Sequence, residues 1–530
     1  MKAENILLRS QPVSSMPPGT SPIWIQGGAS APVHSTGIKD IWAKVGLSAR
    51  KLVHLVESKA PDFPVVNPLD LNFGAVANAI AGARAMAVPS VAEPTGAIKP
   101  HKKVLMINLI AADCNLTRYQ YQNIVQQQKV GSDENTHLVA YIDVGPNKNP
   151  VDGQWSGCRG YYINQDPQAD TITSEVFGDY GDHVDMSNPK QLRDFVLDAI
   201  NKFPADQVVI VYNDHGGGEF GEMADDHDGS FASISGIAWV NAEVKKACGK
   251  PLMAIHDACM ENTIEVMYEN RASLDFMVGS QETIGGSGLP YTFILGGKLS
   301  EAIAQLQKSF KLKAARNLRG GAHEAISAGL KEFAQSIIGV ARAHPNGVDT
   351  LAAEQLDGGQ AAFGTAGAKE PPFDCLIDTI KPLAAAIRAT SDKDAVRQGI
   401  EASESYGGGY PPYNDIRDLY DMCQQIAKRT SDPKLKAATA AVIAQLEPGS
   451  NNLILDSENN AKTHPRSHGI SIFCGSPKTQ NYGASPFATE TGWGDALASL
   501  QSNGTTEEEM RVWPDGSPRT SKEPQGPPIA

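Results

Sequence analysis

Five short apolar runs separated by helical segments constrain the fold of this 530-residue chain more than any other feature. The runs are nearly continuous in apolar residues, and helical spacing appears between them at 190–203, 240–248 and 260–271. Such runs are typical of parallel strands that helices cover on both faces. We therefore predict an α/β fold with a mostly parallel sheet flanked by helices over residues 101–300. The expected strands are 104–110, 138–144, 208–212, 252–255 and 274–278.

Two motifs stand directly after neighbouring runs. Residues 213–218 (NDHGGG) follow one run, and residues 256–260 (HDACM) follow the next. Ligands of such sheets lie beyond the carboxyl ends of the strands, so His215 and Cys259 are expected at one edge. A thiol beside an imidazole is the arrangement of a cysteine nucleophile and its base. His215 would take the thiol proton and return it to a leaving amine.

The surroundings of Cys259 bear on its reactivity, because the thiolate is the nucleophile. The helical pattern at 260–271 begins directly after Cys259, and free N–H groups at a helix start favour an anion. The backbone N–H groups of Gly216 and Cys259 are candidates to stabilise an oxyanion. Each residue also has a structural interpretation, because a cysteine that ends a buried strand is commonly a core residue and His215 could be a loop residue.

The two motifs and their flanks resemble those of the clostripain-like cysteine peptidases, relatives of gingipains, legumains and caspases. That family has a His-Gly and an Asp-Ala-Cys motif on a caspase-like α/β sheet. The likeness includes an Ala-Ala-Asp-x-x-Leu turn after the first strand and a Phe-Pro-Ala-Asp segment before the histidine strand. It covers about 102–300 closely and 300–480 more loosely. The matching segments are 104–116, 137–143, 203–207, 265–269, 276–280, 288–291 and 469–472.

The resemblance implies an endopeptidase that cleaves after Arg or Lys through a thioester. His215 would be the base, Cys259 the nucleophile, and Asp257 the carboxylate that selects the basic side chain. A carboxylate in a partly desolvated pocket can hold guanidinium with two hydrogen bonds and Lys as a point charge. Asp257 could instead cap the helix expected from Met260. Two other hypotheses stay open: the same fold cleaving after a non-basic residue, and a catalytically silent caspase-like scaffold used for binding.

The chain departs from the family pattern at two places. Family members are often self-cleaved at Lys or Arg between the histidine and the cysteine, whereas residues 216–244 contain neither. Only Lys245, Lys246 and Lys250 precede Cys259 in that interval, so we expect a single chain or one matured elsewhere, for instance by loss of its first hundred residues. Gln281 stands where the family usually has Glu, which bears on the strength of the basic preference.

Acidic residues crowd the segment after His215, namely Glu219, Glu222, Asp225, Asp226 and Asp228. Oxygen-rich loops can bind calcium, and some relatives in the family depend on it, but the spacing lacks the EF-hand pattern. A solvated acidic loop is the alternative interpretation. We expect no required cofactor and assign no metal-ligating residues, with calcium as the candidate ion.

Four regions are expected along the chain: an N-terminal extension or prosegment (1–100), a catalytic domain (101–300), a helical C-terminal region (301–485) and a disordered tail (486–530). The polar, Pro-rich composition of the tail motivates the last of these. Helical patterns in the third region cover 301–312, 320–343, 376–389 and 416–429, followed by a late strand at 469–474.

Composition narrows the partners and the compartment. The net charge of −14 and the lack of a basic stripe argue against nucleic acid, and no apolar run is long enough for a bilayer. Seven cysteines without a C-x-x-C motif indicate reduced thiols. The N-terminus lacks a secretory pattern, so we expect a cytoplasmic protein by default, with signal-independent export as the alternative. The expected partners are protein or peptide substrates, with neither nucleic acid nor membrane, and the expected state is a monomer.

Overall fold

The computed structural model describes residues 98–146, 155–182, 184–296, 321–344, 347–356, 371–447 and 453–501. Residues 1–97 of the expected N-terminal extension, the helix at 301–312 and the tail beyond residue 501 lie outside the described residues. Within the described ranges, the helices are too short or too polar to cross a bilayer.

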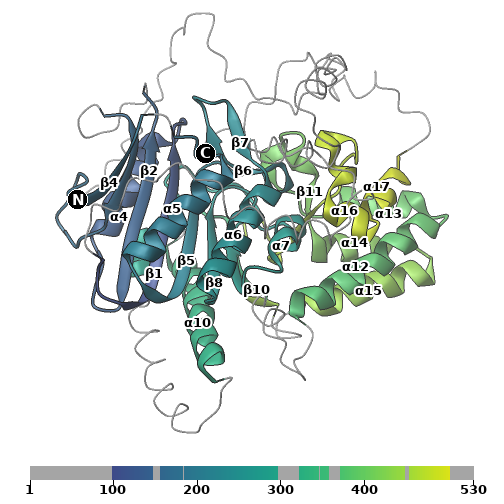
Figure 1. Ribbon diagram of the computed structural model, residues 1–530. Helices are drawn as coiled ribbons and strands as arrows, with labels where there is room; N and C mark the ends of the chain where they lie inside the picture. Colours follow the sequence, from purple (N-terminus) through teal and green to yellow (C-terminus); the bar gives the residue numbers. More distant parts are fainter. Residues whose placement is uncertain are drawn as a thin grey trace, which may run out of the picture.

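A nine-stranded sheet forms the centre of the molecule (Figure 1). Its five middle strands are parallel, and antiparallel strands complete both edges. The prediction of an α/β fold with a mostly parallel central sheet is confirmed, and each of the five apolar runs is a strand of this sheet. In order across the sheet the strands are β12 (Ile454–Asn459), β10 (Thr350–Gln355), β9 (Phe276–Gly279), β8 (Leu252–Asp257), β5 (Ala205–Asn213), β1 (Lys102–Ala112), β2 (Thr136–Val144), β3 (Gly157–Tyr162) and β4 (Glu175–Gly181).

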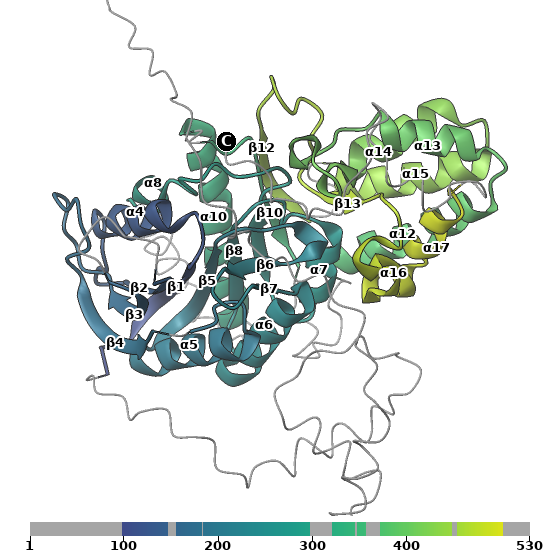
Figure 2. The same cartoon turned by 90° about the horizontal axis from the view of Figure 1, so that it is seen from above.

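Helices cover both faces of the sheet, which explains why the central strands are apolar without alternation. Along β1, Leu105, Ile107 and Leu109 belong to one hydrophobic core, while Met106 and Ile110 belong to the other. Over the sheet, the first core lies under three helices and the second under three others (Figure 2). The first three are α5 (Pro189–Lys202), α6 (Ile234–Cys248) and α7 (Ile264–Asn270), and the second three are α4 (Thr117–Gln128), α8 (Tyr291–Leu295) and α10 (Gly321–Ala343). The first core also continues among the helices of residues 372–498.

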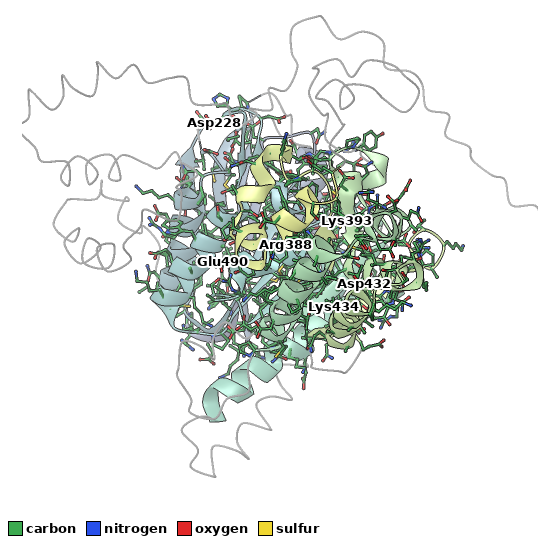
Figure 3. The ribbon with its side chains drawn as sticks, turned by 90° about the vertical axis from the view of Figure 1, so that its right-hand side faces the viewer. Asp228, Arg388, Lys393, Asp432, Lys434 and Glu490 are labelled. Carbon is green, nitrogen blue, oxygen red and sulfur yellow. The ribbon has the colours of Figure 1, made fainter. Side chains whose placement is uncertain are left out.

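The C-terminal helices form a group beside the sheet, on the right of Figure 1. Asp432 caps one of them by accepting a hydrogen bond from the Lys434 N–H at 2.9 Å (Figure 3). Arg388 joins two others through an ion pair with Asp495 at 3.1 Å. The group comprises α12 (Pro372–Ala389), α13 (Lys393–Glu401), α14 (Leu419–Arg429), α15 (Pro433–Leu446), α16 (Pro486–Thr491) and α17 (Trp493–Ala498).

Four shorter strands form two small sheets outside the main one. Two of them follow the His215 motif, and the late strand expected at 469–474 pairs within the helical group. The first sheet contains β6 (Glu222–Asp225) and β7 (Ser230–Ala232), and the second contains β11 (Ile416–Asp418) and β13 (Ser471–Phe473). The helix expected from residue 416 therefore begins three residues later, at Leu419.

Two of the expected region boundaries are wrong. The boundary at residue 300 does not separate two units, because β10 and β12 from the C-terminal region continue the catalytic sheet beyond β9. The tail expected from residue 486 begins too early, because α16 and α17 lie within it. Trp493 is fully buried there, and its indole N–H donates to the Phe473 carbonyl at 2.8 Å. The composition of residues 486–530 as a whole is polar, so it did not reveal the short apolar segment at their start.

Candidate active site

Strands β5 and β8 place the two sequence motifs side by side at the same edge of the sheet. Their parallel register ends with Asn213 beside Asp257, and His215 and Cys259 each lie two residues further along. His215, Asp257 and Cys259 all line one cavity of about 40 Å³. That volume accommodates on the order of three water molecules. The structure thus brings together the three side chains that the sequence singled out.

Glycine at position 216 is required by the close approach of the two motifs. A Cβ atom there would lie 2.5 Å from the Cys259 carbonyl oxygen and 2.6 Å from Glu261 Oε1. The same Glu261 oxygen accepts hydrogen bonds from the N–H groups of Gly217 and Gly218, each at 3.0 Å. The backbone after His215 is therefore packed directly against the turn that carries Cys259.

Asn115 contacts the candidate base and was not recognised as a site residue from the sequence. Its Oδ1 lies 2.7 Å from Nε2 of His215, and it follows β1 in the chain. It belongs to the Ala-Ala-Asp-x-x-Leu turn, 111–116, which was noted only for its resemblance to the family. That turn was the available signal. A hydrogen bond to one ring nitrogen orients the imidazole and selects its tautomer.

Cys259 does not lie at the start of a helix, so the expected helix from Met260 is wrong. Met260 has a positive φ of 62°, which is incompatible with a right-handed helix at that residue. Helix α7 begins only at Ile264, and the Thr263 hydroxyl caps its N-terminus. Burial raises the pKa of the Cys259 thiol to about 12, and the nearby acids, Glu282 foremost, add to the effect. The free N–H groups of a helix start, expected to favour the thiolate, therefore lie too far along the chain to act on Cys259.

Asp257 is buried and accepts three hydrogen bonds, none of them from a backbone N–H in the first turn of a helix. Tyr291 Oη donates at 2.7 Å, the Leu289 N–H at 3.0 Å and Asn213 Nδ2 at 3.1 Å. The alternative role of Asp257 as a helix cap is therefore wrong, since Thr263 caps α7. Burial raises the pKa of Asp257 to about 6, so the carboxyl is largely ionised at neutral pH.

A second carboxyl group, Asp214, lines the same cavity and was not expected there. Its Oδ1 accepts from Gln120 Nε2 and from the Cys114 thiol, each at 3.0 Å. Burial raises the pKa of Asp214 to about 8, so it is mainly protonated at neutral pH. Cys114 and Asp214 also offer atoms within 4.8 Å of a His215 ring nitrogen, but Cys114 does not line the cavity. Asp257 is thus the carboxyl that carries most of the negative charge in the cavity.

Gln281 points away from the cavity and joins the sheet to the helical group. Its amide donates to Asp418 Oδ2 at 3.1 Å, and its oxygen accepts from the Gly469 N–H at 2.8 Å. The glutamine is not among the residues that line the cavity. Gln281 therefore contributes to the packing between regions and not to the lining of the cavity.

The acids that follow His215 in sequence separate into different environments. Asp225 and Asp228 converge with Asp185, and Asp225 also lies with Asp113 and Asp143, each group having ligand atoms within 4.8 Å of one another. Glu222 instead turns toward His256. Burial and the neighbouring aspartates raise the pKa of Asp143 to about 8. The loop acids are thus only part of an acidic group whose other members come from strand ends.

Solved structures with similar folds include C11 proteases. An inactive zymogen C11 protease from Parabacteroides distasonis superposes with a TM-score of 0.51 at 16% identity, covering 74% of this chain and 99% of that one. A secreted C11 cysteine protease from Bacteroides thetaiotaomicron, in complex with an irreversible peptide inhibitor, gives a TM-score of 0.47 at 16% identity, with the same 74% and 99% coverage. No curated protein matches the chain in sequence.

The sheet and its two helical layers thus have the caspase-like fold of the C11 proteases. The model of the clostripain family matches residues 109–499, and the chain belongs to that family. The resemblance noted in the sequence is confirmed. As a member of this family the protein is a cysteine-type peptidase, and its substrates are proteins or peptides.

Proposed function

We propose that the protein is an endopeptidase that cleaves after Arg or Lys, with Cys259 as nucleophile and His215 as base. The observation that supports this proposal is the shared cavity, which Cys259, His215 and the ionised Asp257 line together. Of the described residues that line it, none is a lysine or arginine. The cavity therefore offers a thiol, a base and net negative charge at one place.

The reaction follows from these groups. His215 takes the Cys259 proton as the sulfur attacks the carbonyl carbon, and the peptide C–N bond breaks as the leaving amine receives that proton. Water then hydrolyses the thioester, with His215 again as base. The N–H groups of Gly216 and Cys259 are the proposed donors to the oxyanion, where losing one donor typically costs about 3 kcal/mol.

Burial of Cys259 affects how the thiol becomes reactive. A thiol whose pKa is raised to about 12 is neutral at physiological pH. The proton therefore moves to His215 during the attack, and the resting enzyme does not hold a thiolate–imidazolium pair. Asn115 supports this step by holding Nε2 of His215, so that the ring keeps one orientation.

The proposed selection of a basic side chain rests on Asp257. An ionised carboxylate has about four acceptor positions, and three are used by Asn213, Leu289 and Tyr291. One position is left for a substrate cation, which suits a single charged N–H contact. That position is on Oδ1, because Asn213 and Tyr291 both donate to Oδ2. Gly288 leaves its approach open, because a Cβ at that residue would lie 3.0 Å from Asp257 Oδ1.

Covalent labelling tests the nucleophile and the specificity together. The full chain is treated with peptidyl chloromethyl ketones ending in Arg, Asp or Leu, and the adduct is located by peptide mapping. We expect the Arg reagent to modify Cys259, with loss of labelling in Cys259→Ser and strong reduction in Asp257→Asn.

Other outcomes of the labelling have distinct meanings. Preferred labelling by the Asp or Leu reagent would show that the enzyme cleaves after a non-basic residue. An adduct on Cys114 would show that Cys114, and not Cys259, is the nucleophile. A folded protein that reacts with none of the reagents would support the binding scaffold.

We also propose that calcium binds where Asp113, Asp143 and Asp225 converge. Asp143 is buried, and its Oδ1 has no hydrogen-bond partner in the described structure. Carboxylate oxygens are the ligands that calcium prefers, so the donor set fits the ion. Asp228 lies at the upper rim of the molecule in Figure 3, where it would complete the outer side of the site.

Thermal unfolding in calcium and in magnesium tests this site. Calcium should raise the unfolding temperature of the parent, while Asp143→Asn should respond far less. Asp378→Asn, which alters an exposed acid of α12, is the matched control and should respond like the parent. A parent protein that does not respond to millimolar calcium would contradict the site.

A further inference from the structure

A second group of possible ligands lies between the two motifs, entirely inside the protein. Glu222 comes from β6, His256 from β8 and Glu261 from the turn after Cys259. At most 1% of each residue is exposed. Each offers one ligand atom, and the three atoms lie within 4.8 Å of one another.

Two polar atoms of this group have no hydrogen-bond partner in the described structure. His256 uses Nδ1 to contact Glu222 Oε2 at 2.9 Å, but its Nε2 is unpartnered. Glu261 uses Oε1 to accept two glycine N–H groups, but its Oε2 is unpartnered. Buried polar atoms are nearly always satisfied, so such atoms require an explanation.

Charge gives an independent reason to look for a bound cation. Two carboxylates approach one imidazole, and within the described ranges no lysine or arginine forms an ion pair with either glutamate. Burial and the charge of Glu222 both raise the pKa of Glu261. A buried carboxylate pair needs a proton or a cation, because isolated charges are strongly disfavoured in a protein interior.

We propose that Glu222, His256 and Glu261 bind a divalent cation of the zinc and manganese class. An imidazole nitrogen with two carboxylate oxygens suits these borderline ions, whereas the all-oxygen group around Asp143 suits calcium. Glu222 lies 34 positions before His256, which is why local spacing gave no indication of this group. The ion would join β6, behind the His215 loop, to the turn after Cys259.

The depth of the site predicts how the ion exchanges. Since all three side chains are buried, the ion must enter during folding or through local opening. We therefore expect it to remain bound during dialysis of the folded protein against a chelator. It should be released when the protein is unfolded with chelator present.

Metal analysis of the full chain tests the proposal without relying on activity. The Cys259→Ala background is used so that the catalytic thiol cannot bind the metal. After refolding with Zn²⁺ or Mn²⁺ alone and dialysis against chelator, we expect about one equivalent per chain in this background. His256→Gln and Glu222→Gln should each hold far less, while Asp143→Asn, in the separate acidic group, should hold as much as the background protein.

X-ray absorption of the zinc-loaded background protein covers the case in which these variants fail to fold. We expect only nitrogen and oxygen ligands, at about 2.0–2.2 Å. A sulfur ligand, a background protein that retains no ion, or a folded His256→Gln that retains a full equivalent would overturn the site. None of these results depends on whether the enzyme cleaves after Arg or Lys.

Discussion

Asn213 and Asp257 are register partners on neighbouring parallel strands, and the Asn213 amide donates to Asp257 Oδ2 at 3.1 Å. The same amide also donates to Tyr291 Oη and to Asn123 Oδ1, each at 3.1 Å. This buried network fixes the ends of β5 and β8 relative to each other. Because both motifs continue from this pair, the positions of His215 and Cys259 depend on it.

The reactivity of Cys259 should increase with pH without a plateau. A thiol of pKa about 12 gains thiolate about tenfold per pH unit below that value. We expect the alkylation rate with iodoacetamide to rise continuously from pH 6.5 to 9.5. The rate is measured by mass spectrometry on the Cys259 peptide, with Cys259→Ser to identify signals from other cysteines. A plateau with a midpoint below pH 7 would indicate a resting ion pair instead.

Selection of basic substrates should weaken in acid. The Asp257 carboxyl has a pKa of about 6, so it carries charge above that pH and loses it below. The ratio of kcat/KM for an Arg substrate to that for a matched neutral substrate should therefore fall as the pH drops from 7.5 to 5. The ratio cancels the titration of the Cys259–His215 pair, which acts on both substrates.

The Asp257→Asn variant provides the control for that titration. It should lower kcat/KM for the Arg substrate by about 10- to 100-fold, the usual range for a lost charged hydrogen bond. Its remaining ratio should not change with pH. A pH dependence that persists in Asp257→Asn would assign the selection to another group.

Removal of the Asn115 side chain should slow the chemical step. Asn115→Ala should reduce kcat by about fivefold with little change in KM, since a hydrogen bond that orients a base contributes about 1 kcal/mol. The pH profile of kcat should also shift, because His215 loses a partner. Asn201→Ala, an exposed position on α5, is the matched control. Equal kcat values for Asn115→Ala and Asn201→Ala would show that Asn115 does not contribute to the chemical step.

The chain should remain uncut between His215 and Cys259. Lys245 is held in α6 by an ion pair with Asp275 at 2.6 Å, Lys246 lies in the same helix, and the Lys250 ammonium contacts the Ala205 carbonyl. Peptidases bind extended segments, which a packed helix does not supply. Prolonged incubation followed by intact-mass analysis should show no internal cleavage. A cut that appears in the parent but not in Cys259→Ala would contradict this prediction.

The sequence was most informative where strands are buried on both faces. The run 208–212 is apolar throughout because α5 and α6 cover one side and α4 and α10 the other, and that pattern is readable without a structure. Edge strand β4 is largely exposed, so it lacks such a run and was missed. Strands β10 and β12 were missed because their sequences, TLAAEQ and ILDSEN, do not contain a long apolar run.

The catalytic candidates were readable because each directly follows a strong strand signal. The electrostatic environment of Cys259 could not be predicted, because it depends on the left-handed backbone of Met260. Glycine is the residue that usually indicates such a backbone, and none stands at this position. Contacts such as Glu222 with His256 join residues 34 positions apart and leave no local pattern. The pKa values therefore depend on tertiary packing, whereas the helices and strands could be predicted from the periodicity of apolar residues.

The pairing of β10 with β9 has a practical consequence for anyone who prepares shorter forms of this enzyme. A fragment ending near residue 300 would leave the backbone of β9 open to solvent, and an open strand recruits strands from other molecules. Such a fragment should precipitate even though it contains both motifs. The smallest form that stays in solution must therefore retain the strands contributed from 350–355 and 454–459.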